Sequence, residues 1–530
     1  MAIPRKGCAD MAIPCQRLRR CHPFFERGLL GDAVTKRLLW QRNCRRRRLR
    51  IVPAKADHCP LLVANFQLLT DPEEIHRMFI DVLVAEIGST TTLVNAFSGI
   101  CGDAPRFIAQ GQAPTSVLEG DVRAGLRGAI ADMQAKQGWD SLEYGEMFAT
   151  SSAAGGLRMC VCGLVYDMTV KAAEAAALGA GAIVKLATAG KLSEFDLMDL
   201  QEAKPNLILL AGGTDYGERE TALFNAERIA ESGLRAPVIY AGNVQNQTHV
   251  KSIFDRAGLP CTVTENVYPK LDLLNIEPAR RIIHKVFEEH IVKAPGMEHI
   301  RDMVTGAIMP TPGAVMEASQ LLYGAIGDLV VVDIGGATTD VHSVTNGSDE
   351  IASIQTRPEP FAKRTVEGDL GLYVNAKNLV AMLGEEALSR ELSLDVPAVM
   401  KHYKPIPDTE EQFRLTQRLC REAGVRALTR HAGALRYIYT PSGRKTVAEG
   451  KDLTQVKYIV GTGGALTRLP HREALLRALA DCNTAKMMLY PREGELSLLF
   501  DDDYIMASLG VLSKRYPEAA LRLMKHSLGI

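Results

Sequence analysis

The chain has 530 residues, and its 62 Lys and Arg balance 62 Asp and Glu, so it carries no net charge at pH 7. A hydrophobic fraction of 46% is that of a globular protein, and the length suggests two or more domains. No stretch reaches about 18 consecutive apolar residues, which argues against a transmembrane helix and a membrane partner.

The first 77 residues differ from the rest. Residues 1–78 hold 16 Lys and Arg against 7 Asp and Glu, a net charge of +9, so the remainder carries −9 and is a poor nucleic-acid binder. The segment 1–77 is rich in arginine and cysteine, nearly repeats Met1-Ala2-Ile3-Pro4 at residues 11–14, and shows no helical or strand period. It could be a basic nucleic-acid arm, a targeting peptide or translated sequence upstream of the native start. We favour the third and expect a disordered segment that is unnecessary for folding and nucleotide binding.

The first motif reads Val84-Ala85-Glu86-Ile87-Gly88-Ser89-Thr90-Thr91, an apolar strand that ends in an acid before a glycine and three hydroxyl side chains. A second β-rich run follows, so the pattern predicts a hairpin. Its turn can bind a phosphate, because glycine lets the backbone approach and successive N–H groups form an anion nest. Glu86 at its mouth would hold Mg²⁺. Alone, the motif could be an ordinary β-turn.

Strands and helices alternate next. The runs 182–187, 206–210, 237–240 and 261–264 predict buried strands, with amphipathic helices such as 219–232 and 247–257 between them. This rhythm predicts parallel strands and a doubly wound subdomain over about 157–270. Gly212-Gly213-Thr214-Asp215 and Gly242-Asn243 then lie at strand ends, as tight turns or as a ligand or partner site. The small-residue turn Thr150 to Gly156 could approach a γ-phosphate or permit close packing. Cys160 and Cys162 lack a matching zinc-finger pair, so we expect reduced buried thiols.

A second hairpin repeats the first. Val331-Val332-Asp333-Ile334-Gly335-Gly336-Ala337-Thr338 again places an acid, then glycine, then a hydroxyl between two β-rich runs. Two such hairpins suggest two lobes that face one nucleotide. Gly368 and Asp369, before a predicted helix, are further candidates for its surroundings.

A third motif is Val460-Gly461-Thr462-Gly463-Gly464, a strand and a glycine-rich turn before a helix. Glycines there would let adenine and ribose lie against the backbone. Residues 384–455 predict a helical insert and a hairpin around Pro441-Ser442-Gly443, and the last helices, 504–514 and 517–526, suit a return to the first lobe.

The order of these three motifs resembles phosphate 1, phosphate 2 and adenosine of the acetate and sugar kinase, heat-shock chaperone and actin superfamily. From about Met78 onward the chain also resembles the MutL/GlmL family, an accessory protein of glutamate mutase and related adenosylcobalamin enzymes. The strings that carry this second resemblance are 84–91, 209–217, 238–243, 309–316 and 503–510.

The resemblance implies an α/β protein with a two-lobed, actin-like (ribonuclease H-like) ATPase fold and an inserted doubly wound α/β subdomain. Lobe I would span 78–325 with the insert at about 157–270, lobe II 326–503, and 504–530 would return to lobe I.

The resemblance also implies ATP and Mg²⁺ as cofactors. Glu86 and Asp333 would position Mg²⁺, and Asp333 and Thr338 are the candidate catalytic residues. The nucleotide-binding residues would be Gly88, Ser89, Thr90, Thr91, Gly335, Gly336, Thr338, Gly461, Thr462, Gly463 and Gly464. Glu86 replaces the aspartate common in the superfamily, so we expect a weak ATPase.

The implied function is a cytoplasmic ATP-binding reactivating chaperone for an adenosylcobalamin-dependent mutase such as glutamate (methylaspartate) mutase, whose subunits would be its partners. Two alternatives stay open. One is a small-molecule kinase of the same superfamily, with Asp215 as the base that accepts a hydroxyl proton. The other is a non-catalytic actin-like scaffold or filament. No P-loop motif G-x-x-x-x-G-K-[ST] occurs, which excludes a P-loop NTPase.

Overall fold

The computed structural model describes residues 76–153, 157–441, 443–483 and 487–530, and these described residues belong to one compact unit. The predictions for residues 1–75, and part of the predicted turn Thr150 to Gly156, lie outside the described residues. Within the described part of the chain, no helix has the length and apolar character needed to cross a membrane.

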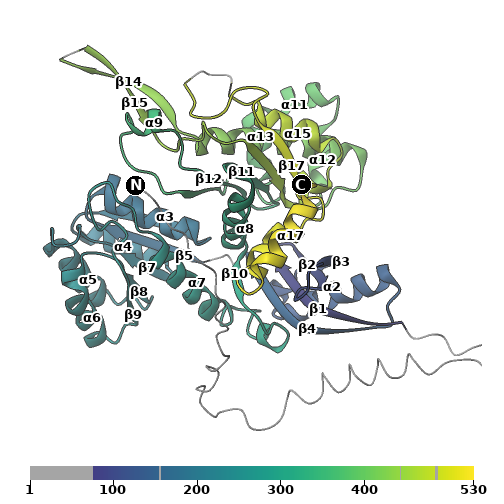
Figure 1. Cartoon of the computed structure of the whole chain (residues 1–530), viewed down its shortest axis with the longest axis horizontal. Helices are drawn as coiled ribbons and strands as arrows, with labels where there is room; N and C mark the ends of the chain where they lie inside the picture. Colours follow the sequence, from purple (N-terminus) through teal and green to yellow (C-terminus); the bar gives the residue numbers. More distant parts are fainter. Residues whose placement is uncertain (1–75, 154–156, 442, 484–486) are drawn as a thin grey trace, which may run out of the picture. The chain divides into compact units, whose positions relative to one another are not determined.

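The first sheet has the strand order β10-β4-β1-β2-β3 (Figure 1). Its first three strands in the chain form an antiparallel meander, whereas β4 runs parallel to β1 and β10 parallel to β4. Helix α2 (Val122–Gln137) buries Leu126, Ala129 and Met133 in the same core as the β1 side chains Leu83 and Ala85. The strands are β1 (Arg77–Ile87), β2 (Thr91–Ser98), β3 (Arg106–Pro114), β4 (Ser141–Ser151) and β10 (Ile308–Pro310).

The second sheet repeats this plan with the order β13-β12-β11-β16-β17. Strands β11, β12 and β13 again form an antiparallel meander. Strand β16 runs parallel to β11, and β17 runs parallel to β16. The strands are β11 (Leu329–Ile334), β12 (Thr339–Val344), β13 (Ala362–Glu367), β16 (Tyr458–Thr462) and β17 (Ser497–Phe500). The two sheets therefore share one strand order and the same strand directions. In each sheet, the first two strands along the chain form one of the two predicted phosphate hairpins.

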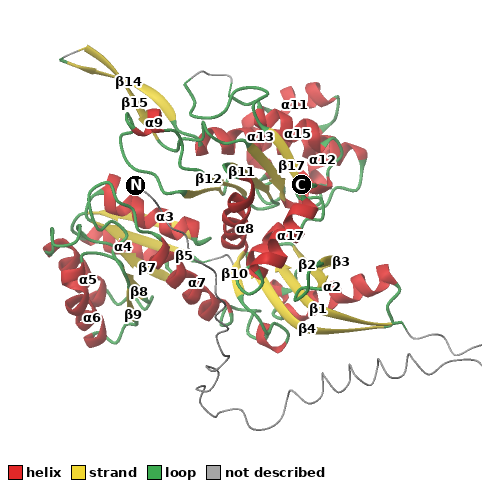
Figure 2. Cartoon of the chain, in the orientation of Figure 1, coloured by secondary structure: helices red, strands yellow, loops and turns green. Residues whose placement is uncertain are grey.

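The third sheet, β6-β5-β7-β8-β9, is entirely parallel. Its faces are covered by different helices, because Met159 and Val161 point into the core that holds α3 and α7, whereas Cys160 and Cys162 point into the core of α4, α5 and α6 (Figure 2). Both thiols are free and buried, and burial raises the pKa of Cys162 to about 12. The bounds are β5 (Arg158–Gly163), α3 (Lys171–Gly179), β6 (Ile183–Ala189), α4 (Glu194–Ala203), β7 (Leu207–Leu210), α5 (Glu220–Glu231), β8 (Val238–Tyr240), α6 (Gln247–Arg256), β9 (Cys261–Val263) and α7 (Glu277–Ile291).

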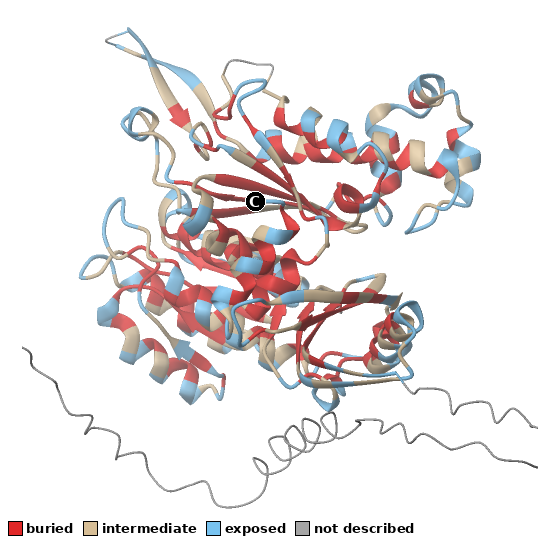
Figure 3. Cartoon of the chain, turned by 45° about the vertical axis from the view of Figure 1, so that its right-hand side comes forward, coloured by how far each residue is buried: buried red, intermediate tan, exposed pale blue. Residues whose placement is uncertain are grey.

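One apolar core is shared by the first two sheets. Val82 and Val84 of β1 and Leu329 and Val331 of β11 enter the same buried cluster, which α8, α16 and α17 complete. Figure 3 shows that buried segments, in red, gather where strands and helices pack together, whereas exposed ones, in pale blue, lie on the outside. A Cβ at Gly510 would collide with the Ala314 carbonyl, so α16 and α8 approach as closely as glycine allows. The helices are α8 (Thr311–Ile326), α16 (Met506–Leu512) and α17 (Pro517–Ser527).

The remaining helices pack mostly on the second sheet, whereas β14 and β15 form a two-stranded sheet of their own. The predicted helical insert and hairpin over 384–455 are confirmed as α11 to α13 and the strand pair β14–β15. Their bounds, with those of the neighbouring helices, are α9 (Asp349–Ala352), α10 (Ala376–Leu383), α11 (Glu385–Leu392), α12 (Val396–Lys401), α13 (Glu410–His431), β14 (Ala434–Thr440), β15 (Gly443–Glu449), α14 (Gly463–Arg468) and α15 (Arg472–Ala480). The chain has the two-lobed α/β fold of the actin-like ATPases with an inserted doubly wound subdomain, which confirms the predicted fold class.

Candidate functional site

The two predicted phosphate hairpins close with the same turn. Gly88 N donates to Thr91 O at 3.0 Å, and Gly335 N donates to Thr338 O at 3.0 Å. A Cβ at Gly88 would lie 2.7 Å from the Thr91 carbonyl oxygen, which is why glycine is needed there. Each turn presents its residues at the end of a central buried strand, as anion binding by backbone groups requires.

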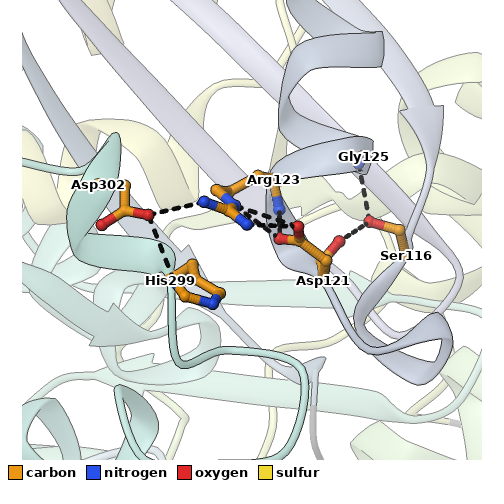
Figure 4. Close-up of polar contacts among 6 residues, drawn as sticks. All are labelled: Ser116, Asp121, Arg123, Gly125, His299 and Asp302. Atoms are coloured by element: carbon orange, nitrogen blue, oxygen red, sulfur yellow. Dashed lines mark hydrogen bonds and ion pairs between the residues drawn. The ribbon is translucent and has the colours of Figure 1, made fainter.

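The loop after β3 supports the first turn. Thr115 donates its hydroxyl to Gly88 O at 2.8 Å and its N–H to Thr90 O at 3.0 Å. Figure 4 shows how the following residues are fixed: Ser116 accepts the Gly125 N–H, and Asp121 and Asp302 both bind Arg123. These hydrogen bonds lower the pKa of Asp121 to about 2, so this support is ionised at every physiological pH.

A matching segment supports the second turn. Leu372 N donates to Gly335 O at 3.1 Å, and Asn375 Nδ2 donates to Ala337 O at 3.0 Å and to Gly368 O at 2.7 Å. The segment that holds the candidates Gly368 and Asp369 therefore packs on this turn. The Asp369 carboxylate itself forms an ion pair with Arg430.

Four carboxylates, those of Glu86, Asp333, Asp340 and Asp501, interact electrostatically near the strand ends of the two lobes. Burial, with the charges of Asp501 and Asp333, raises the pKa of Glu86 to about 7. Burial, with the charges of Asp340 and Asp501, raises the pKa of Asp333 to about 7. Mutual repulsion of buried carboxylates is relieved by a cation, so this arrangement fits a divalent metal.

Asp333 is the better placed of the two predicted metal ligands. Among the described residues, no side chain or backbone group donates a hydrogen bond to its carboxylate. Glu86 differs, because its Oε1 accepts the Ser508 hydroxyl at 2.6 Å, the Ser508 N–H at 3.1 Å and Asn95 Nδ2 at 3.4 Å. Among the hydrogen bonds of the described residues none reaches Glu86 Oε2, so this oxygen is the one left for a cation or its water.

Over the described ranges, no group of three or more His, Cys, Asp or Glu side chains could enclose a metal.

The third motif packs against the second. Gly463 has φ +83°, and a Cβ there would collide with the Asp333 carboxylate and lie 2.8 Å from Ile334 N. Gly464 has open space where its side chain would be, and Gly461 lies inside β16. Thr462 is buried and donates its hydroxyl to Asp501 Oδ2 at 2.9 Å, so only its backbone is left to face a ligand.

Sequence reasoning missed Asp501, which is the most completely bonded carboxylate of the site. Besides Thr462, it accepts hydrogen bonds from Ile505 N, Met506 N and Ser527 Oγ. It thereby joins the end of β17 to α16 and α17. An acid directly after a buried strand is the same signal that identified Glu86 and Asp333.

Two polar chains leave the site. Glu86 is linked through Asn95 and Gln110 to Arg468 of α14, with Gln110 Nε2 2.8 Å from Asn95 Oδ1 and Arg468 Nη2 2.9 Å from Gln110 Oε1. These contacts join side chains of the first sheet to the third motif.

The second chain starts at Thr338, whose hydroxyl donates to Asp340 Oδ2 at 3.0 Å. Asp340 forms a buried ion pair with Arg364, at 2.5 Å. Arg364 Nη1 donates to the carbonyl oxygens of Leu178 at 3.0 Å and Ala182 at 3.2 Å, at the end of α3. The second turn is thus bonded, through two buried side chains, to the inserted subdomain.

Asp215, the base of the kinase alternative, lies in the loop that follows β7 of the inserted sheet. Its Oδ1 accepts Val244 N at 2.9 Å and Asn266 Nδ2 at 3.0 Å. Thr150, by contrast, pairs in register with Glu86, so the turn that begins there starts beside the first motif.

The sequence of the chain is similar to that of known proteins. The profile of a family described as MutL protein matches residues 82–528. The protein MutL of Clostridium tetanomorphum is 38% identical over 465 residues, which cover 84% of this chain and 98% of that protein.

Among solved structures, nucleotide-free acetone carboxylase aligns at 11% identity and a TM-score of 0.35, over 82% of this chain and 70% of its own. Glycerol dehydratase reactivase aligns at 11% identity and a TM-score of 0.29, over 82% and 99%. Component A of the (R)-2-hydroxyglutaryl-CoA dehydratase of Acidaminococcus fermentans aligns at 9% identity and a TM-score of 0.27, over 84% and 99%.

Proposed function

Because the chain belongs to the MutL family, we propose that it is an ATP-dependent accessory protein that reactivates an adenosylcobalamin-dependent mutase such as glutamate (methylaspartate) mutase. The observation that carries the ATP-dependent part is the pair of equal turns at the ends of β1 and β11, each preceded by a carboxylate whose pKa is raised to about 7. The mutase class follows from the motif resemblance.

In this proposal the carboxylates of Asp333 and Glu86 would hold Mg²⁺. The turns 88–91 and 335–338 bind phosphates through their backbone N–H groups and hydroxyls, and the backbone of 461–464 lies against the adenosine. Mg²⁺ supplies charge neutralisation on the phosphates when it is bound.

Binding is proposed to favour one arrangement of the lobes, because the phosphate and adenosine residues belong to two different sheets. A ligand biases such an equilibrium only by its differential affinity for the two states, at about 1.4 kcal/mol for each factor of ten. The Thr338–Asp340–Arg364 chain is the proposed route by which the inserted subdomain senses that change. A partner that contacts the insert reciprocally alters nucleotide affinity.

In the test, the protein is mixed with glutamate mutase that carries damaged, inactive cobalamin, in a buffer of cytoplasmic pH and ionic strength. Mg-ATP and fresh adenosylcobalamin are then added, and the recovery of mutase activity is measured. Recovery that needs both ATP and an intact Asp333 supports the proposal. ATP consumption that ignores the mutase but rises with a sugar or a carboxylic acid would support a kinase instead, and ATP-dependent sedimentation would support a filament.

A further inference from the structure

The five parallel strands of the inserted sheet end at one edge, and each is followed by a segment with an exposed large apolar side chain. Parallel strands bring all their carboxyl ends to the same edge, where doubly wound sheets bind their ligands. We call this the carboxyl edge of the insert. Its exposed side chains are Tyr166 after β5, Phe195 after β6, Tyr216 after β7, Val244 after β8, and Leu271 and Leu273 after β9.

These side chains are not on loose loops. Buried Asn243 accepts the Tyr216 N–H at 3.2 Å, and Asp215 joins Val244 N to the buried Asn266. Tyr216 has φ +63°, which a bulky residue adopts at a cost in strain, and yet its side chain is 78% exposed. A bonded framework that holds an aromatic ring in water is what a recognition surface requires, because little conformational entropy is then lost on binding.

The charged residues around the carboxyl edge indicate which kind of partner can bind there. The segments 164–170, 190–196, 211–219, 241–246 and 264–275 hold seven acidic and three basic residues. Two of the acids, Asp167 and Glu194, form ion pairs with Arg357 and Arg228 outside these segments, so five acidic residues remain against three basic ones. An acidic edge repels nucleic acid and anionic lipid, and in a second copy of this chain it would meet its own charge. It suits a protein face that is apolar at its centre and basic at its rim.

We propose that the carboxyl edge of the insert is the docking surface for the mutase, an inference that rests on the proposed function. Five strands spaced about 4.8 Å apart span roughly 19 Å, enough for a central apolar contact of an ordinary protein interface. The edge is connected to lobe II, because Asp167, next to Tyr166, forms an ion pair with Arg357. A partner seated there is therefore in reach of a change in the second sheet.

The experiment measures binding of purified glutamate mutase to the immobilised full chain, with and without Mg-ATP. The edge variant is Tyr216→Asn with Leu271→Ser, since asparagine tolerates the left-handed backbone. The matched control is Tyr439→Asn, because Tyr439 is 82% exposed and lies on β14, away from the insert's strands. Both variants remove exposed side chains, so both should keep the thermal midpoint and the Mg-ATP affinity of the wild type.

The expected result is a loss of at least about tenfold in mutase affinity for the edge variant and no change for the control. A photo-crosslinking residue at position 216 should capture the mutase, and one at position 439 should not. Equal binding by wild type and edge variant overturns the docking surface and leaves the proposed function standing. No binding by the wild type in any nucleotide state overturns both. A wild-type dimer in sedimentation that the edge variant abolishes would assign the edge to a second copy and overturn this assignment.

Discussion

Ser508 donates both its hydroxyl, at 2.6 Å, and its backbone N–H, at 3.1 Å, to Oε1 of Glu86. This pair ties the end of β1 to the first turn of α16, where the helix dipole also favours a carboxylate. One oxygen of Glu86 is thus committed to the fold. The other oxygen, Oε2, is the one that can face a cation. One side chain therefore makes a structural contact through Oε1 and can bind a ligand through Oε2.

Glu86→Gln should keep the stability of the protein and weaken Mg-ATP binding, because the amide oxygen can still accept from Ser508 while the negative charge is lost. Glu86→Ala should instead lower the free energy of unfolding by about 1–3 kcal/mol, since the buried hydroxyl and N–H of Ser508 lose their acceptor, whereas Asn95 Nδ2 keeps Ser508 Oγ at 2.8 Å. Urea denaturation and calorimetry with Mg-ATP separate the two effects. Equal stability of both variants would show that the Ser508 contact contributes nothing.

Asp333→Asn should reduce Mg-ATP affinity by about 100-fold, or ~2.7 kcal/mol, more than Glu86→Gln does. Its carboxylate has no hydrogen bond from the described residues, so nothing in the fold depends on its charge. The thermal midpoint without nucleotide should stay the same or rise. Unchanged Mg-ATP affinity in calorimetry would refute the metal assignment.

The pH dependence follows from the same carboxylates. The folded pKa values of Glu86 and Asp333 are raised to about 7 from 4.5 and 3.8, so between about pH 4 and 7 the folded state holds protons that the unfolded state has lost. Their contribution to stability is therefore present at low pH and lost as the pH rises through 7. Without nucleotide, the thermal midpoint should fall from pH 6 to pH 8 less steeply in Asp333→Asn than in the wild type.

Mg-ATP should reverse this trend, because the metal binds the ionised carboxylates and expels their protons. Its affinity should rise from pH 6 to pH 8, and calorimetry in buffers of different ionisation enthalpy should detect proton release. Proton uptake on binding would contradict the assigned protonation states.

Features formed by residues close together in the sequence could be predicted, whereas contacts between residues far apart in the sequence could not. Both hairpin turns and the strand-to-helix turn at Gly463 were predictable, because the strand, the acid and the glycine lie within a few residues. Glu86 and Ser508 are 422 residues apart, and Arg364 and Leu178 are 186 apart. No local pattern carries such pairings, since they depend on how the sheets pack. The carboxyl edge lies between these cases: its strands were predicted, but its side chains could have been buried by another element.

The route into the insert can be tested with Thr338→Val, which removes the hydroxyl that donates to Asp340 and leaves the Asp340–Arg364 pair in place. In the wild type, Mg-ATP should change hydrogen exchange of the amides at the end of α3, because Arg364 bonds the carbonyls there. The variant should lose that response. Thr429→Val on α13, whose hydroxyl bonds only Val425 O of its own helix, is the control and should retain it. A full response in Thr338→Val would show that the signal takes another path.

The two glycines of the third motif provide a matched pair for the nucleotide site. Gly463→Ala should destabilise the protein by about 1–2 kcal/mol, because its φ of +83° strains any Cβ and that Cβ would collide with the Asp333 carboxylate. Displacing Asp333 should also reduce Mg-ATP affinity. Gly464→Ala meets open space and should leave the thermal midpoint unchanged. If adenosine lies against this backbone, the Gly464 methyl should weaken ATP binding while inorganic triphosphate binds as before. ATP affinity that survives Gly464→Ala intact would move the adenosine away from this turn.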